Sequence, residues 1–422
     1  MLRILKFIGA FLATLLVVVL LVFGFNFDPL LSLIENSDDL QEGSEWVAQA
    51  SSLQGLTEYV AAHPGRVSIL STSLQNPDST LAYGPHAPHT MGTLGNFFLL
   101  AEFARRAEAG ELDPSHTVPL EAVERYQLPY MDATNHRNAL RSLAEGEDIR
   151  SAEIGRRITL GALMQSAVQF NDLAASDWLW FRLAGEGGEN LDALMARMGL
   201  SDTELPLPFS GLYTVLNPHL AGATWPAHLD SLGRMDRRTF TDSVIAAARR
   251  LHDDPAFRER VQDTFRRHEG MGIGFTQQRD ALALFPKSTA AELAGLMEGL
   301  QRDSLLSSAV SRRIKSYMDW PLEGGRLTQD FSSYGALYDS RLGMANGMDY
   351  GSSAYTGEPF AQTVYFDPLQ VAFWFHMSSN LMHQDFQQRL IWDPALRRAT
   401  AQAILEAGSA TAPTDTLNPE QP

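Results

Sequence analysis

A run of apolar residues ending before Gly110 is the feature that most constrains how this chain can fold. Seven positions make it apolar on nearly every face: Phe97, Phe98, Leu99, Leu100, Ala101, Phe103 and Ala104. A helix of this kind is buried. It is followed by the basic pair Arg105 and Arg106 and by Gly110, a residue suited to helix termination. The sequence therefore predicts a helix through the centre of a core, with its N-terminus at a crevice.

The N-terminus of this predicted helix is occupied by Gly92. Free N–H groups and the positive end of the helix dipole gather at such a terminus, which makes it a good place for an acyl-enzyme nucleophile and its oxyanion. Gly92 has no side chain to serve as that nucleophile. Two strands, predicted at 66–72 and 80–83, and a turn containing Pro85 and Pro88 precede it.

This arrangement resembles the penicillin-recognising serine hydrolases, and most closely the class A β-lactamases. In that family a Ser-x-x-Lys motif opens a buried helix after a strand pair and a short turn. At the matching position this chain reads Gly92-Thr93-Leu94-Gly95. The resemblance therefore implies that the serine has become Gly92 and the lysine has become Gly95.

The second family motif, Ser-Asp-Asn, resembles Asn171-Asp172-Leu173 in this chain. Only the aspartate is kept. Asp172 is either a remnant of the catalytic loop or an N-cap of the following helix, because aspartate is a preferred N-cap residue. A weaker match to the Glu-x-x-Leu-Asn loop of class A enzymes lies at 213–217, where Tyr213 or Thr214 replaces the glutamate.

The third family motif, Lys-Thr-Gly, resembles Ala345-Asn346-Gly347. A competing register, Arg341-Leu342-Gly343, retains a cation but fits the downstream strands less well. The chain has only three lysines, Lys6, Lys287 and Lys315. None of them is near a motif in the sequence, so the lysine base of the family is predicted to be missing. Arginine cannot replace it, because its guanidinium does not deprotonate near neutral pH.

The order of elements agrees with the fold that the resemblance implies. That fold is α+β, with an antiparallel sheet built from both ends of the chain and an all-helical lobe between them. Helices are expected at 45–63, 160–183, 239–268 and 393–407, and a further helix is expected to begin after Ser288 as its N-cap. A loop is expected at 209–224. C-terminal strands are expected at 336–345 and as a hairpin of 360–366 with 369–377.

An apolar run from Ile4 to Phe25, with Lys6 as its only charge, is long enough to span a bilayer. Basic residues precede it and acidic residues follow it, which places the N-terminus in the cytoplasm and the rest in the periplasm or at the cell surface. A cleaved signal peptide is the alternative. The predicted organisation is an anchor or signal at 1–25, a linker at 26–44, the β-lactamase-like domain at 45–408 and a disordered tail at 409–422.

Composition limits the possible partners and cofactors. The formal net charge of −17 argues against nucleic acid, whose phosphates need a basic surface. The absence of cysteine excludes disulfides and thiolate metal sites. We expect no cofactor and no metal. The expected partners are the membrane, through the N-terminal segment, and a cell-wall peptide or an envelope protein.

The loss of all three motifs favours an extracytoplasmic protein that binds or scaffolds and has no serine acyl-transfer activity. The alternative is an active hydrolase with a displaced nucleophile, for which Thr90 and Thr93 are the candidates. A third possibility is a metal hydrolase that uses His86, His89 and His136. Histidines in loops are more often simply solvated, so this pattern is weak.

Overall fold

The computed structural model describes residues 37–50, 52–145, 149–152, 155–320 and 329–411. Within these ranges no helix combines the length and the apolar character needed to cross a membrane. The segment Ile4 to Phe25, predicted as the anchor, lies outside the described residues, as does the end of the predicted tail.

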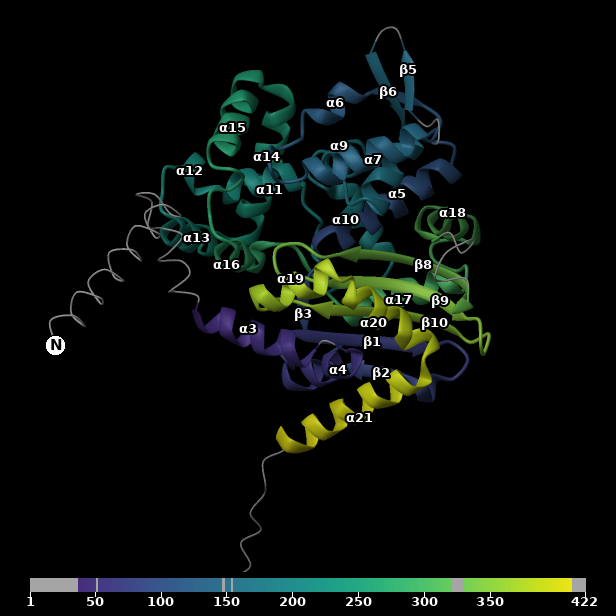
Figure 1. Cartoon of the computed structure of the whole chain (residues 1–422). Helices are drawn as coiled ribbons and strands as arrows, with labels where there is room; N and C mark the ends of the chain where they lie inside the picture. The colour runs from purple at the N-terminus through teal and green to yellow at the C-terminus, as the bar shows by residue number, and fades with distance from the viewer. Residues whose placement is uncertain (1–36, 51, 146–148, 153–154, 321–328, 412–422) are drawn as a thin grey trace, which may run out of the picture.

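A five-stranded antiparallel sheet forms the centre of the molecule, in the order β2-β1-β10-β9-β8 (Figure 1). Its strands are β1 (Val67–Ser73), β2 (Leu81–Tyr83), β8 (Phe331–Asp339), β9 (Asn346–Ser353) and β10 (Pro359–Phe366). Strands from the N-terminal part pair directly with strands from the C-terminal part, since Val67 lies opposite Phe366. This confirms the prediction that both chain ends build one sheet.

One face of the sheet is covered by helices from the two ends of the described chain. They are α3 (Ser37–Gln49), α4 (Leu53–Ala62), α19 (Val371–Ser379), α20 (Met382–Trp392) and α21 (Pro394–Thr411). Together with the sheet they enclose a core that contains Leu56, Tyr59, Ile69, Phe366 and Phe386. The predicted helix at 45–63 is therefore two helices, and residues 37–44 are helical where a linker was predicted.

The strand predicted at 369–377 is wrong, because this segment forms the helix α19. Its Val, Phe and Trp content is typical of strands. The buried residues Phe373 and Met377 are, however, four positions apart, which is the spacing of one helix face. β10 therefore pairs with β1 and β9 and not with a hairpin partner. The strand predicted at 336–345 likewise divides between the end of β8 and the turn before β9.

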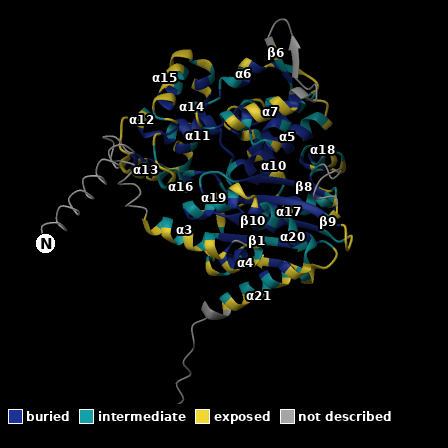
Figure 2. Ribbon diagram, in the orientation of Figure 1, coloured by how far each residue is buried: buried dark blue, intermediate teal, exposed yellow. Residues whose placement is uncertain are grey.

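The opposite face of the sheet packs against α17 (Ala290–Gln301) and, beyond it, the helical lobe. The lobe helices nearest the sheet are α5 (Asn96–Glu108), α8 (Leu160–Gln169), α9 (Leu173–Leu183), α10 (Glu189–Arg197) and α18 (Ser308–Met318). All residues of α5 from Asn96 to Ala104 are buried, as Figure 2 shows by the dark ribbon. The prediction of a central buried helix is confirmed.

The outer part of the lobe has its own core around Leu212, Val244, Leu251, Val261 and Phe265. Its helices are α11 (Phe209–Leu216), α12 (Pro218–Ala221), α13 (Trp225–Gly233), α14 (Arg237–Asp253), α15 (Pro255–Arg267) and α16 (Phe275–Asp280), followed by a 3₁₀ turn at Ala281–Leu284. Two further lobe helices, α6 (Leu120–Glu124) and α7 (Ala133–Glu145), contribute to the main core instead, and another 3₁₀ turn, Pro77–Ser79, connects β1 to β2. The loop predicted at 209–224 is thus wrong, because α11 and α12 occupy it.

The lobe also departs from the all-helical prediction. A small sheet joins β4 (Thr117–Pro119), β6 (Gly155–Thr159) and β5 (Ile149–Ala152) at its far edge. A second short pair, β3 (Pro88–Thr90) with β7 (Lys287–Thr289), links the strand region to the lobe. Thr289, and not Ser288, is the N-cap of α17, and its hydroxyl accepts the N–H of Glu292.

Candidate functional site

The turn that precedes the central helix leaves no free space for a side chain at Gly92. It is a 3₁₀ turn, η2 (Gly92–Gly95), that leads directly into α5. Gly92 has a φ of +54°, which L-residues with a side chain adopt at a cost. A Cβ atom at this position would lie 2.1 Å from Asp339 Oδ2 and 2.9 Å from Met344 Cε. A serine cannot replace Gly92 unless Asp339 moves.

Asp339, the last residue of β8, occupies the space in front of the helix N-terminus. Its Oδ2 accepts a hydrogen bond of 2.6 Å from the backbone N–H of Thr93, and its side chain is buried. In an acyl-transfer enzyme, an N–H group at this terminus is available to a developing oxyanion. Here the protein's own carboxylate uses it. No local sequence pattern marks Asp339, because only the position of β8 at the edge of the sheet brings it to this turn.

Arg341 joins Asp339 to the helical lobe. Its Nε lies 3.3 Å from Asp339 Oδ1, and its guanidinium donates to the carbonyl of Asn171 at 2.9 Å. Burial lowers the pKa of Arg341, but the nearby carboxylates Asp339 and Asp132 outweigh burial and raise that pKa above its usual value. Arg341 thus stays charged and links Asp339 at the end of the sheet to the Asn171 carbonyl of the helical lobe.

The predicted second motif lies on the lobe side of this network. Asn171 has a φ of +53° and ends the predicted long helix at 160–183, which is why the structure has α8 and α9 in its place. Its side-chain amide donates to the carbonyl of Tyr338 on β8 at 2.8 Å. Leu173 is buried in the outer lobe core.

Asp172 is the N-cap of α9. Its Oδ1 accepts the N–H groups of Ala174 and Ala175 at 3.1 and 3.2 Å. Its Oδ2 accepts from the Ser166 hydroxyl at 2.6 Å and lies 2.9 Å from His136 Nδ1. Burial raises the pKa of Asp172, but these partners, His136 first, bring it below its usual range. The carboxylate of Asp172 therefore caps α9 and also holds the Ser166 and His136 side chains.

A second carboxylate lies at the same helix terminus. Asp132 Oδ2 accepts the N–H of Leu173 at 2.6 Å. Burial raises the pKa of Asp132 to about 7, against the opposing effect of Arg341. Arg341, Asp339, Asn171, Asp132, Asp172 and His136 thus form one buried polar network between the sheet and the lobe.

The predicted third motif lies at the start of β9, the strand next to β8 in the sheet. Ala345 packs in the core between the sheet and α19 to α21. The Asn346 side chain donates to the carbonyl of Thr90 at 2.9 Å and accepts the N–H of Phe366 at 2.9 Å. A Cβ at Gly347 would meet Tyr338 and Gln387. The assignment of Ala345-Asn346-Gly347 to the third motif stays a prediction. The strand whose end contacts Thr93 is β8.

Neither candidate for a displaced nucleophile has an exposed hydroxyl. Thr93 is 2% exposed, and Thr90, at 3%, directs its hydroxyl to the carbonyl of Leu282 at 3.3 Å. The structure corrects one point, since Lys287 lies directly opposite Thr90 in the β3–β7 pair and is not remote from the motif. Lys287 begins the strand β7, which also includes Ser288, the predicted N-cap.

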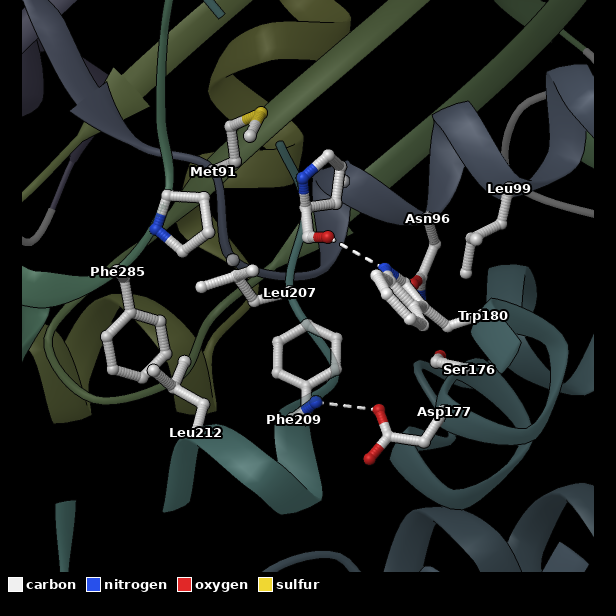
Figure 3. A pocket seen from close by; sticks show the side chains of 14 residues that line it. Met91, Asn96, Leu99, Ser176, Asp177, Trp180, Leu207, Phe209, Leu212 and Phe285 are labelled. Carbon is white, nitrogen blue, oxygen red and sulfur yellow. Dashed lines mark hydrogen bonds between the residues drawn. The ribbon is translucent and has the colours of Figure 1, made fainter. Parts of the chain in front are cut away.

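A cavity beside Gly92 and Gly95 has room for little more than one water molecule, at about 10 Å³. Figure 3 shows apolar side chains around it, among them Leu99, Trp180 and Leu212. A Cβ at Gly95 would lie 3.2 Å from the Pro206 side chain. A side chain at Gly95, the predicted position of the family's lysine, would therefore be crowded by Pro206.

The three histidines of the metal hypothesis have separate surroundings. His86 is exposed. His89 bonds Ser68 through Nε2 and stacks on Tyr365, and burial lowers its pKa to about 4. His136 bonds Asp172. In the part of the chain that the structure describes, no three His, Asp or Glu side chains converge as a metal site.

A larger cavity of about 250 Å³ lies along the outer edge of β8. Its lining residues come from the helical lobe and from the sheet with its neighbouring segments, and several of them carry amide or hydroxyl groups. They are Val168, Gln169, Asn171, Asp319, Trp320, Ala336, Tyr338, Ser340 and Gln384. The Tyr338 carbonyl at its wall already accepts from Asn171. This cavity borders the Asn171 loop and remains open where the Gly92 turn is closed.

One comparison with known proteins shows the family of this chain. The sequence pattern described as the β-lactamase enzyme family matches residues 51–334. A search of curated protein sequences finds no match. Among solved structures, the β-lactamase of Sphaerobacter thermophilus is 13% identical, covering 85% of this chain and 98% of its own, with a TM-score of 0.45.

Two further solved structures are of the same kind. A double mutant of the class A β-lactamase of the last common ancestor of Gram-negative bacteria is 14% identical, covers 85% and 100% of the two chains and has a TM-score of 0.46. A mutant of PBP-A, determined as an acyl-enzyme complex with penicillin G, is 11% identical, covers 80% and 96% and has a TM-score of 0.44.

A central sheet from both chain ends, with a buried helix that begins at the lobe boundary, defines a β-lactamase-like α+β domain. Since the family pattern covers more than half of its residues, the chain belongs to the β-lactamase enzyme family.

Proposed function

We propose that this protein is a member of the β-lactamase family that binds or scaffolds and does not transfer acyl groups. The observation that carries the proposal is the Asp339 carboxylate, which lies 2.1 Å from where a Cβ of residue 92 would be and binds the Thr93 N–H. One buried side chain thus takes the space that a nucleophile at position 92 would need and binds a backbone N–H that could otherwise serve an oxyanion. An enzyme of this class needs both.

The alternative, an active hydrolase that uses Thr90 or Thr93, has less support. Both residues are buried, so a carbonyl substrate has no route to either hydroxyl without rearrangement of the turn. Asp367 accepts the backbone N–H of Thr90 at 2.7 Å, and burial raises the pKa of this carboxyl to about 6. A base is therefore near Thr90, but the solvent-exposed nucleophile is missing.

The cavity along β8 is the place where we expect a ligand. Its volume of about 250 Å³ and its mixed lining suit an extended peptide group, because the amide and hydroxyl side chains in it can pair with a peptide backbone. A cell-wall peptide is the ligand that family analogy favours. An envelope protein that offers an extended segment is the second candidate.

We further propose that Ile4 to Phe25 anchors the protein in a membrane and that the domain lies outside the cytoplasm. The support is the length of the apolar run and the change from basic to acidic residues across it. The net charge of −17 is consistent with a partner other than nucleic acid.

Labelling with a fluorescent penicillin tests the absence of acylation. The wild-type protein should give no covalent adduct by intact-mass spectrometry, while a penicillin-binding protein that accumulates its acyl-enzyme serves as the positive control. The double variant Gly92→Ser, Gly95→Lys should also remain unlabelled, because Asp339 and Pro206 fill the space of the new side chains. A hydroxylamine-sensitive adduct on the wild type, mapped to Thr90 or Thr93, would overturn the proposal in favour of the displaced nucleophile.

Titration with a purified cell-wall peptide tests the binding role. Ser340→Tyr should weaken binding at least tenfold, because the ring would fill part of the β8 cavity. The matched control is Ser332→Tyr, the same substitution at an exposed position near the other end of β8. Equal affinities in the two variants would show that the peptide does not use this cavity.

A further inference from the structure

Three aromatic rings lie together on the surface near the N-terminal end of the described chain. Phe275 is the first residue of α16, and Trp374 and Phe375 lie on α19. The Phe375 ring centroid is 5.0 Å from that of Phe275 and 4.7 Å from that of Trp374. Phe275 and Phe375 are 51% and 42% exposed. We name Phe275, Trp374 and Phe375 the aromatic patch.

The chain enters the described domain directly beside this patch. Asp39, the third residue of α3, forms an ion pair with Arg279 and accepts the N–H of Val371 at 3.1 Å. Arg279 follows Phe275 by four residues on α16, and Val371 precedes Phe375 by four residues on α19. Four residues are about one helical turn, or ~6 Å along the axis. One carboxylate thus ties the start of α3 to both helices that carry the patch.

The apolar N-terminal run is tethered close to the same place. Residues 26–36 connect Phe25 to the first residue of α3, Ser37. A stretch of this length reaches at most ~40 Å when fully extended. If the run spans a bilayer, the aromatic patch is therefore held within about that distance of the lipid surface. Aromatic side chains are favoured at the membrane interface, where their rings lie among the headgroups.

We propose that the aromatic patch rests on the surface of the lipid bilayer and orients the domain there. This inference rests on the proposed membrane anchor. The surface that the aromatic patch contacts is that of a neutral bilayer. A chain with a net charge of −17 gains nothing from anionic lipids. Docking through exposed rings therefore requires no negative headgroups.

Docking in this way also orients the β8 cavity. The Trp374 indole N–H donates to the carbonyl of Ser340 at 3.2 Å, and Ser340 lines that cavity. The patch and the cavity are thus joined by one hydrogen bond at the end of β8. A membrane contact at the patch sets the height and direction from which a ligand approaches the cavity.

The full chain allows a direct test because it contains no cysteine. Phe275→Cys and Phe375→Cys are each labelled with an environment-sensitive fluorophore, in protein reconstituted into phosphatidylcholine vesicles. Tyr355→Cys is the matched control, since Tyr355 is a 64% exposed aromatic residue in the turn between β9 and β10, at the other end of β10 from α19. Brominated lipids should quench the probes at 275 and 375 at least threefold more than the probe at 355.

The other outcomes separate this inference from the anchor. Protein that sediments with the vesicles but shows equal quenching at 375 and 355 retains its anchor and overturns the docking. Protein that does not sediment with vesicles overturns both proposals. Probes at 275 and 375 that are shielded from aqueous iodide and also from brominated lipid show that protein covers the patch, either residues 1–36 or a second copy, and this too overturns the docking.

Discussion

At the scale of single residues, Gly92 decides what the crevice can do. Its positive φ and its contact with Asp339 are two separate obstacles to a side chain. A family that places its nucleophile at this position needs the opposite, a side chain that projects into an open cleft. The Thr93 N–H at this helix terminus is bound by the Asp339 carboxylate, so a side chain at position 92 is opposed by the geometry of the turn as well as by residue type.

Gly92→Ala should destabilise the fold by about 3 kcal/mol. A left-handed conformation costs a residue with a Cβ ~1–2 kcal/mol, and crowding in a packed site adds ~1–3 kcal/mol. Gly110→Ala is the matched control, because Gly110 has a φ of +72° but no atom within 4 Å of its Cβ position. It should cost only about 1 kcal/mol. Equal urea midpoints for the two variants would mean that Asp339 does not close the site.

At the scale of elements, the sequence predicted the existence of helices and strands better than their ends. The breaks come from single residues whose effect depends on tertiary contacts. Asn171 can adopt a positive φ because its amide bonds Tyr338 across the lobe boundary, and this contact is invisible in the local sequence. The 239–268 helical stretch divides into α14 and α15 at Asp254, the shared cap, just before Pro255.

The N-terminus of α9 offers a test at this scale. Asp172→Ala should destabilise the protein by about 3 kcal/mol, because it removes a cap worth ~1 kcal/mol and leaves the buried His136 without its carboxylate, which costs a further ~1–3 kcal/mol. The control is Asp236→Ala, which removes the exposed cap of α14 and should cost about 1 kcal/mol. Chemical denaturation measures both. If the two variants lost similar amounts of unfolding free energy, Asp172 would contribute no more than an ordinary N-cap.

At the scale of the whole molecule, the sheet and the central helix could be predicted from the order of apolar patterns in the sequence. The candidate site could not be predicted in this way. The strand pair near Val67 and the strand near Phe360 each carry alternating or continuous apolar residues that mark them as sheet. Asp339 has no such signal. It reaches Thr93 because β8 is the edge strand and its end pairs with Asn346, and that register is set by the complete sheet.

The final prediction concerns the independence of the domain from its N-terminal segment. Deletion of Met1 to Phe25 should release a soluble protein that unfolds cooperatively, because the cores on both faces of the sheet and in the outer lobe are built from Trp46 onward. The remaining aromatic patch should give at most weak, reversible association with neutral vesicles, since a single small apolar contact anchors a protein only marginally. Membrane fractionation and thermal denaturation of the full-length and truncated proteins measure the two properties. Firm retention of the truncated protein in the membrane fraction would contradict the anchor at Ile4 to Phe25. Loss of cooperative unfolding would show instead that this segment belongs to the folded core.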